Sequence, residues 1–209
     1  MNKQFLEILL NWPKSYISGT DLTHILDKSA NSRHAIVKRT VREGYLTPIR
    51  RDLYAIKNPK KPLINAFEIA LIIQGPSYIS FESALSYHGW IPEAVRTTTC
   101  ACVKKSTKFE TLIGVFSYEH IPITAFPLGV EAHLQNGVFV LIASPLKAIA
   151  DIIYTRKRTW DSVHDLLEDF RIEPESFQNL DKQLLKELIE NYPSLRVKKT
   201  LSILGLFRI

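Results

Sequence analysis

The stretch NSRHAIVKRTVREGYLTPIRRDLYAI, residues 31–56, decides how the first part of this 209-residue chain folds. Residues 31–42 have the spacing of an amphipathic helix, and Gly44 is typical of a helix end. Residues 45–49 and 53–56 are rich in β-forming side chains and flank a short polar turn. The stretch therefore predicts a helix followed by a β-hairpin.

Two further helices are predicted before this stretch. Residues 3–11 are amphipathic and end before Pro13, and residues 19–21 supply capping side chains for a second short helix. Helix, helix-turn-helix and then a hairpin is the order of a winged helix-turn-helix domain.

Positive charge is concentrated in the same part of the chain. Up to Lys61 there are 12 Lys and Arg residues against 5 acidic ones, a net charge of +7, whereas the remaining 15 basic and 16 acidic residues leave −1. A basic module joined to a neutral one is typical of nucleic-acid-binding proteins.

The predicted third helix has two distinct sides. Four residues at helical spacing are expected to pack inward: Ile36, Val37, Thr40 and Val41. The other side is polar and basic around the small Ala35, which allows close approach to a major groove, where Arg or Lys reads guanine and Asn reads adenine. Arg50 and Arg51 lie at the hairpin turn, where a wing meets phosphates or the minor groove. The candidate DNA-binding residues are Asn31, Ser32, Arg33, His34, Lys38, Arg39, Arg42, Arg50, Arg51 and Lys57. The alternative interpretation is a basic face that is merely solvated.

A change of composition marks a domain boundary. Residues 59–62, with two prolines and two lysines, are expected to be a linker between a winged helix-turn-helix domain at residues 1–58 and a second domain at residues 63–209. The second part alternates apolar helices with strand-like segments such as RTTTCACV, residues 96–103, and VFVLIA, residues 138–143. The predicted fold class is α+β, the second domain being a small sheet packed by helices.

The sequence lacks the common signatures of catalysis and metal binding. It contains no Asp-x-Lys or Glu-x-Lys, no phosphate-binding glycine-rich loop, no Gly-x-Ser-x-Gly and no His-x-x-x-His. Cys100 and Cys102 have no partner Cys or His at zinc spacing and are interpreted as reduced core residues. We therefore expect no enzymatic activity, catalytic residue, metal or cofactor. With no signal peptide and no apolar run of membrane-spanning length, a cytoplasmic protein without membrane contact is expected.

Three polar groups in the second part have open interpretations. The cluster Glu82, Ser83, Tyr87 and His88 is either an acid–base site or a set of helix-end and anchoring contacts. Lys147 and Asp151 form an i, i+4 pair, read as a helix-stabilising or an interdomain contact. The basic run at residues 156–158 is either a solvated helix end or a further DNA or partner contact.

Three segments resemble the AbiEi-type antitoxins of type IV toxin–antitoxin systems, a family of transcriptional regulators of viral defence. They are the hairpin EGYLTPIRRDLYAI (43–56), YISFESALSYHGWIPE (78–93) and IASPLKAIADIIY (142–154). Asp52 stands where relatives usually have glycine and Leu146 where a charged residue is more usual; aspartate tolerates the turn conformation, so the hairpin should persist. The last 40 or so residues match nothing in the family.

The resemblance implies two activities. The first domain would bind inverted repeats in the promoter of its own operon and repress it, with a homodimer forming on the double-stranded DNA. The second would counteract a co-encoded nucleotidyltransferase-like toxin without necessarily forming a stable complex. Two alternatives remain open: a nucleic-acid-acting enzyme targeted by the basic domain, such as a nuclease or a nucleotidyltransferase accessory, and a regulator with no toxin partner.

Overall fold

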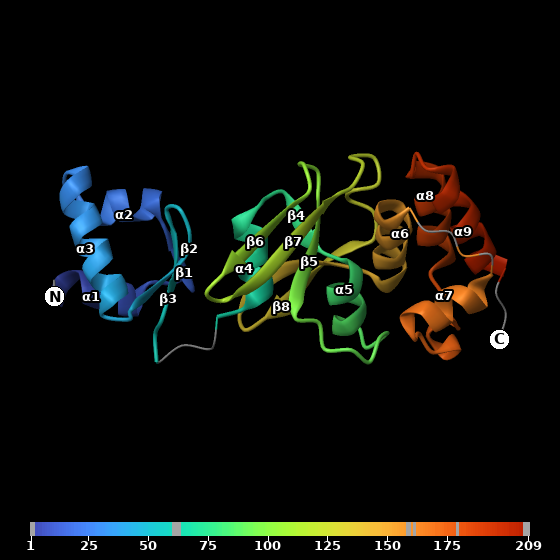
Figure 1. The fold of residues 1–209 in the computed structure, drawn as a ribbon, viewed down its shortest axis with the longest axis horizontal. Helices are drawn as coiled ribbons and strands as arrows, with labels where there is room; N and C mark the ends of the chain where they lie inside the picture. The colour runs from blue at the N-terminus through green and yellow to red at the C-terminus, as the bar shows by residue number, and fades with distance from the viewer. Residues whose placement is uncertain (1–2, 60–63, 158–159, 161, 179, 207–209) are drawn as a thin grey trace. The chain divides into compact units, whose positions relative to one another are not determined.

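The computed structural model describes residues 3–59, 64–157, 160, 162–178 and 180–206. The chain divides into two compact units: residues 1–69 with 110–114 form the first unit, and residues 70–109 with 115–209 form the second. Both units combine helices with strands (Figure 1), which confirms the predicted α+β class at this level. Of the predicted linker, Pro59 is described and residues 60–62 lie outside the described residues.

The first unit places three helices against a three-stranded antiparallel sheet. In chain order its elements are α1 (Lys3–Asn11), β1 (Tyr16–Ser18), α2 (Gly19–Leu26), α3 (Ala30–Arg42), β2 (Leu46–Arg50) and β3 (Leu53–Ile56). The strand order is β1-β3-β2, and Figure 1 shows the helices on one side of this sheet.

The core of the first unit draws at least one side chain from each of its helices and strands. Its buried members are Phe5, Leu9, Ile17, Leu22, Leu26, Val37, Leu46 and Ile56. Each buried aliphatic or aromatic side chain of this kind contributes about 1.5–3 kcal/mol of transfer free energy. Packing of these residues fixes α3 and the hairpin relative to each other.

The predictions for the first unit are confirmed for the helices and the hairpin, with two corrections. The cap of α2 is Ser18, one residue before the predicted capping segment, and it forms a reciprocal capping box with Asp21. Strand β1 was not predicted, because three residues are too few to show an alternating pattern.

The second unit is built around a six-stranded mixed sheet. Helix α4 (Ala66–Ile73) spans the division between the units, and β6 and β7 meet at the short segment 110–114. The other elements are β4 (Ser77–Ile79), α5 (Phe81–Tyr87), β5 (Thr97–Cys102), β6 (Thr107–Thr111), β7 (Gly114–His120), β8 (Val130–Gln135), β9 (Val138–Ala143), α6 (Pro145–Arg156), α7 (Val163–Phe170), the 3-10 helix η1 (Pro174–Phe177), α8 (Lys182–Asn191) and α9 (Leu195–Leu206).

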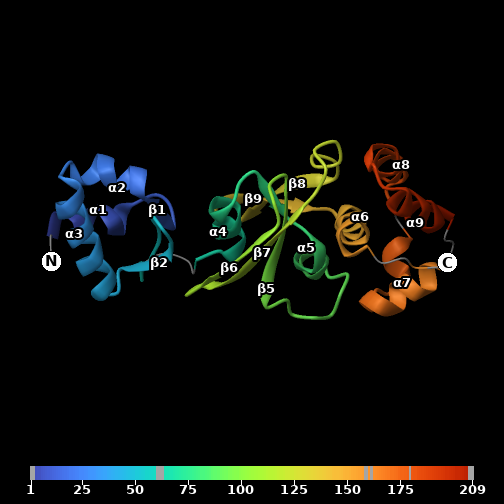
Figure 2. The same ribbon diagram turned by 45° about the horizontal axis from the view of Figure 1, so that its top comes forward.

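The strand order of this sheet is β6-β7-β5-β4-β9-β8. Strands β5 and β7 run parallel, as do β4 and β9, whereas β4–β5 and β8–β9 are antiparallel. Figure 2, like Figure 1, places α6 between the sheet and the helices α8 and α9. Among the described residues, none of the helices combines the length and apolarity needed to cross a bilayer.

The sequence located most elements of the second unit but missed two strands. The predicted strand at residues 138–143 has the observed bounds of β9. The missed strands β6 and β8 are the two edges of the sheet, and their residues (TKFET and VEAHLQ) mix charged and polar side chains with apolar ones. Edge strands are half-solvated, so they lack the apolar run that reveals a central strand.

Candidate nucleic-acid interface

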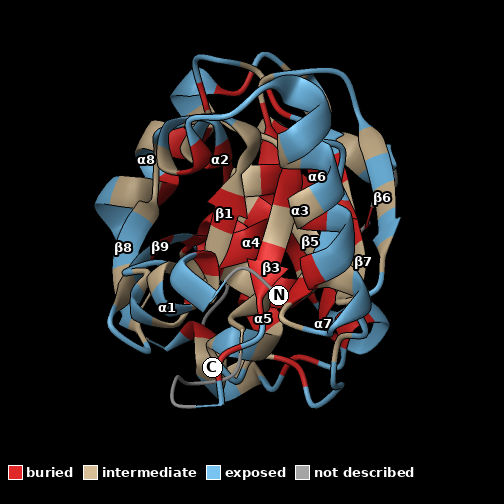
Figure 3. Cartoon of the chain, turned by 90° about the vertical axis from the view of Figure 1, so that its left-hand side faces the viewer, coloured by how far each residue is buried: buried red, intermediate tan, exposed pale blue. Residues whose placement is uncertain are grey.

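Helix α3 presents its polar side to solvent because its inner side is committed to the core. Ser29 caps the helix by accepting a hydrogen bond from the Ser32 amide at 3.4 Å. Val37 and Thr40 are the buried residues of α3, and Ile36 and Val41 pack partly buried against the same core. The predicted inward side is therefore confirmed, and the rest of the helix is largely exposed (Figure 3).

The hairpin turn is tied to the start of α2. The Gly19 amide donates a hydrogen bond to the Asp52 carbonyl oxygen at 2.7 Å, and a Cβ atom on Gly19 would lie 2.8 Å from the Cβ of Asp52. Asp52 has a φ of 57°, the left-handed conformation that glycine adopts most easily. The turn is therefore a fixed feature of the unit.

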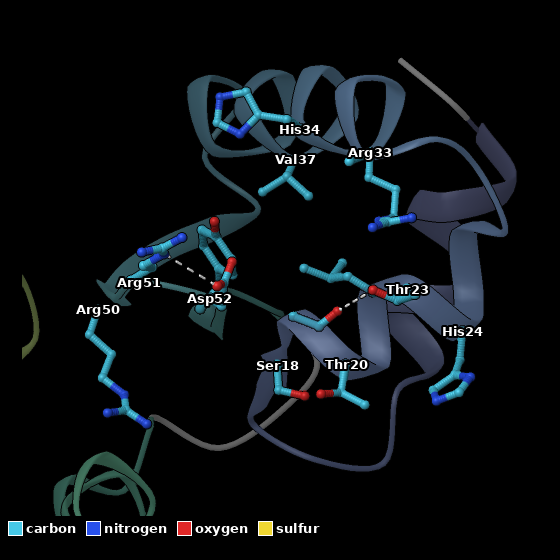
Figure 4. A pocket seen from close by; sticks show the side chains of 14 residues that line it. Ser18, Thr20, Thr23, His24, Arg33, His34, Val37, Arg50, Arg51 and Asp52 are labelled. Carbon is cyan, nitrogen blue, oxygen red and sulfur yellow. Dashed lines mark hydrogen bonds and ion pairs between the residues drawn. The ribbon is translucent and has the colours of Figure 1, made fainter.

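A groove of about 660 Å³ lies between α2, α3 and the hairpin turn (Figure 4); we call it the basic groove. Four of the ten predicted DNA-binding residues line it: Arg33, His34, Arg50 and Arg51. Figure 4 shows Arg33 reaching from the first turn of α3 toward α2, with Arg51 and Asp52 across the groove at the turn. The structure thus brings cationic side chains from two separate elements around one depression.

The other six predicted residues do not line the basic groove. Asn31, Ser32, Lys38, Arg39 and Arg42 are exposed on α3 outside the lining. Lys57 follows β3 and donates its amide to the Tyr45 carbonyl oxygen, at the end of the hairpin opposite the turn. Together with the groove, these residues make a candidate interface centred on α3.

Sequence reasoning missed the contribution of α2. Thr23 and His24 line the basic groove, and Thr23 Oγ1 donates to the Gly19 carbonyl oxygen at 2.9 Å. Neither residue belongs to a basic run, so charge alone gave no signal. Gly19 was the available clue, because a residue without a side chain at a helix start permits another backbone to approach closely.

Several charges at the interface already have partners. Arg39 Nε lies 3.0 Å from Glu43 Oε1, one turn along α3, and the Arg33 guanidinium donates to the Lys28 carbonyl oxygen. At the turn, Arg51 Nε lies 3.7 Å from Asp52 Oδ2, although the Arg51 side chain is 97% exposed. Exposed ion pairs are weak, so a phosphate can compete with Glu43 for Arg39 and with Asp52 for Arg51.

Two titratable groups near the groove are held in defined states. Partial burial and the charge of Asp52 raise the pKa of Tyr54, which keeps its hydroxyl protonated. Burial opposes ionisation of Asp21, but the hydrogen bonds from the Ser18 side chain and amide outweigh it and lower the pKa of the Asp21 carboxyl. The capping carboxylate is therefore charged at the start of α2.

In the second unit, Tyr87 and His88 meet at the ring of His133, whereas Glu82 and Ser83 make separate contacts. Glu82 forms an ion pair with Arg156, and Ser83 Oγ donates to the Thr97 carbonyl oxygen. His88 Nε2 donates to the Ala143 carbonyl oxygen at 3.0 Å. The Tyr87 hydroxyl, which is the most exposed of the set, lies 3.4 Å from a ring nitrogen of His133. Glu82 and Ser83 therefore join α5 to α6 and β5, and the rings of Tyr87 and His88 join the end of α5 to β8.

Of the basic run at residues 156–158, Arg156 is therefore paired and Lys157 is exposed in the left-handed conformation; Arg158 lies outside the described residues. Neither described residue tests whether the run contacts DNA or a partner. Both cysteines are buried with free thiols, and burial raises the pKa of Cys100. The described part of the chain holds no group of three or more His, Cys, Asp or Glu residues arranged to bind a metal.

Lys147 and Asp151 form the centre of a fully buried polar cluster. Lys147 Nζ lies 2.9 Å from Asp151 Oδ1 and donates to the Ala125 carbonyl oxygen at 2.8 Å. Asp151 accepts from Tyr78, Ser80 and Tyr192. All these partners belong to the second unit, so the pair is an internal core contact and the interdomain alternative is wrong.

The protonation states of the cluster follow from its burial. Burial, together with the negative charge of Asp151, raises the pKa of Tyr78 and Tyr192 well above the ordinary value. Burial also lowers the pKa of Lys147, against the opposing effect of Asp151. A buried pair with every hydrogen bond made specifies one packing arrangement of the core.

No protein-family model matches the chain, and a comparison with curated proteins finds no match. The likeness to AbiEi-type antitoxins therefore rests on the three quoted segments alone.

Proposed function

We propose that the first unit is a winged helix-turn-helix domain that binds double-stranded promoter DNA and represses transcription of its own operon. The observation that carries this proposal is the arrangement of exposed cations on α3 and at the hairpin turn around one groove. The order of helices and strands, with a three-stranded antiparallel sheet, agrees with such a domain. The concentration of positive charge before residue 62 supplies the long-range attraction to DNA.

In this proposal α3 reads base edges in the major groove. Lys38 and Arg42 are exposed on the same side of the helix, one turn apart, and Asn31 lies near its start. Arg or Lys donates to guanine O6 and N7, whereas Asn pairs with adenine N6 and N7. Inverted repeats would place two protomers on one operator, because the symmetry of the DNA is matched by that of the bound pair.

The test is fluorescence anisotropy with the duplex immediately upstream of the gene and a scrambled duplex, measured over a salt series. The wild-type chain should prefer the upstream duplex by about 10³ or more. Lys38→Ala with Arg42→Ala should reduce that preference by roughly 30-fold or more, since two base contacts of about 1–3 kcal/mol each supply about 2–6 kcal/mol of discrimination. The charge-matched control is Lys182→Ala with Lys186→Ala on α8, which should leave the preference unchanged. An intact preference in the α3 variant would show that α3 does not read the operator.

We further propose that the second unit counteracts a co-encoded nucleotidyltransferase-like toxin. The support is the resemblance of residues 78–93 and 142–154 to the antitoxin family. Cells that produce the neighbouring gene product alone should stop growing, and cells that also produce this chain should grow. Absence of rescue would leave a regulator with no toxin partner.

A further inference from the structure

The basic groove combines features that separate it from the exposed face of α3. It is a depression bordered by three elements, whereas Lys38, Arg39 and Arg42 project from a single helix into solvent. Arginines lie on both of its sides: Arg33 comes from the first turn of α3, and Arg50 and Arg51 come from the hairpin (Figure 4). The groove therefore offers cations from opposite sides to one extended anionic chain.

Both arginines are held on rigid supports. The Arg33 guanidinium donates to the Lys28 carbonyl oxygen and is half-buried. The turn that carries Arg51 is attached to α2 by the Gly19–Asp52 backbone hydrogen bond of 2.7 Å. Because the turn is attached to α2, it cannot extend far into a minor groove of DNA. Arg51 therefore contacts DNA from its position beside the basic groove. The Arg33 guanidinium, which is already hydrogen-bonded, loses less conformational freedom on binding than the 97% exposed side chain of Arg51.

The groove lining also fits a phosphodiester better than a base. Arginine forms bidentate hydrogen bonds with phosphate oxygens, and arginines line the groove from opposite sides. Recognition of base edges needs a protruding element that enters the major groove of DNA. In this unit the protruding element is the outer side of α3, beside the basic groove. The carboxylate of Asp52 opposes an anion and limits its affinity.

We infer that the basic groove seats one strand of the DNA backbone, gripped between Arg33 and Arg51, while the outer side of α3 reads the bases. This inference rests on the proposed DNA-binding function and assigns a separate role within it. Arg33 and Arg51 supply affinity that is independent of sequence. Asp52 reduces that affinity and so raises the relative weight of the base contacts.

The experiment compares Arg33→Ala and Arg51→Ala with Lys186→Ala, which removes an exposed cation of α8 in the second unit. Anisotropy is measured with the upstream and the scrambled duplex over a salt series. Each groove variant should weaken binding to both duplexes by the same factor, roughly tenfold. Each should also lower the salt slope by about one unit. Asp52→Asn should strengthen binding to both duplexes equally, and Lys186→Ala should change little.

Circular dichroism of each variant controls for folding, and Arg33→Lys and Arg51→Lys should retain most of the salt slope because they keep the charge. A loss confined to the upstream duplex would overturn the inference, since it would make the arginine a base contact. Unchanged binding by both groove variants would overturn it too. The inference would also be overturned if inorganic phosphate displaced the DNA at constant ionic strength, because the groove would then be a small-anion site.

The proposed function fails separately, if the wild-type chain shows no preference for the upstream duplex. In that case Arg33→Ala and Arg51→Ala would still show, on either duplex, whether the basic groove binds the DNA backbone. Absence of binding to both duplexes would overturn both proposals.

Discussion

Gly19 and Asp52 show how closely two backbones approach at the hairpin turn. The Cβ that any other residue would place at position 19 meets the Cβ of Asp52 at 2.8 Å and its Cγ at 3.2 Å. Asp52 itself adopts the left-handed conformation with a φ of 57°, which costs a non-glycine residue up to about 1–2 kcal/mol. The hairpin turn therefore approaches α2 so closely that residue 19 has no room for a side chain.

Gly19→Ala should destabilise the first unit by about 1–3 kcal/mol, because the added methyl group overpacks this contact. Asp52→Gly should rescue the loss, since it removes every side-chain atom of residue 52 that the methyl group meets. Asp52→Ala keeps the Cβ and should not rescue. Urea denaturation followed by circular dichroism measures the free energies of unfolding, and equal rescue by both Asp52 variants would contradict the steric explanation.

At the scale of elements, His88 joins the end of α5 to the end of β9 through its hydrogen bond to Ala143. Burial lowers the pKa of this imidazole below its ordinary value of 6.5, and the nearby His133 acts in the same direction. The hydrogen bond and the charge of Glu131 act in the opposite direction but do not outweigh burial. The folded protein therefore holds His88 in its neutral form.

This contact predicts a loss of stability in mild acid. Because the pKa of His88 is lower in the folded than in the unfolded chain, the unfolded chain binds more protons at pH values between these two pKa values. The stabilisation is fully present above about pH 6.5 and declines as the pH falls toward the folded-state pKa. His88→Gln, whose amide can still donate to Ala143, should remove this part of the decline in urea midpoint between about pH 7.5 and pH 5.5. His164→Gln on the exposed side of α7 is the control, and an unchanged decline in His88→Gln would contradict the assignment.

At the scale of the whole molecule, each unit has a core of its own, and the Lys147–Asp151 cluster organises the second. It connects the sheet through Tyr78 on β4, helix α6 through the pair itself, and the end of α8 through Tyr192. Every one of these side chains is buried. Removing one charge would leave the other without compensation in a region of low dielectric constant.

Lys147→Met should therefore destabilise the second unit by about 3–5 kcal/mol. Adding Asp151→Asn should recover much of the loss, because it removes the stranded charge and keeps an acceptor for the surrounding hydroxyl groups. Trp160 is buried in this unit, so its fluorescence in a variant with the other two tryptophans replaced by Phe reports the unfolding transition. Lys186→Met, exposed on α8, is the control. A double variant no more stable than Lys147→Met would contradict the charge-compensation argument.

The sequence by itself determined the α+β class, the helices of the first unit and the division of α3 into an inner and an outer side. These features follow from local spacing: the 3.6-residue period places Val37 and Thr40 inward whatever surrounds the helix. The sequence also located the hairpin through its turn residues and revealed the charge imbalance between the two parts of the chain.

Only the tertiary structure decided which of these residues meet. Thr23 joined the candidate interface because Gly19 lets the hairpin turn close on α2, a contact between segments more than 30 residues apart. Lys57 lies away from the turn because a hairpin reverses the chain. Local spacing indicated only Asp151 as a partner of Lys147; Ala125, Tyr192 and Tyr78 come from three other segments of the second unit, and no local pattern contains that information. Spacing along a chain fixes faces of elements, whereas the packing of one element against another fixes which faces share a site.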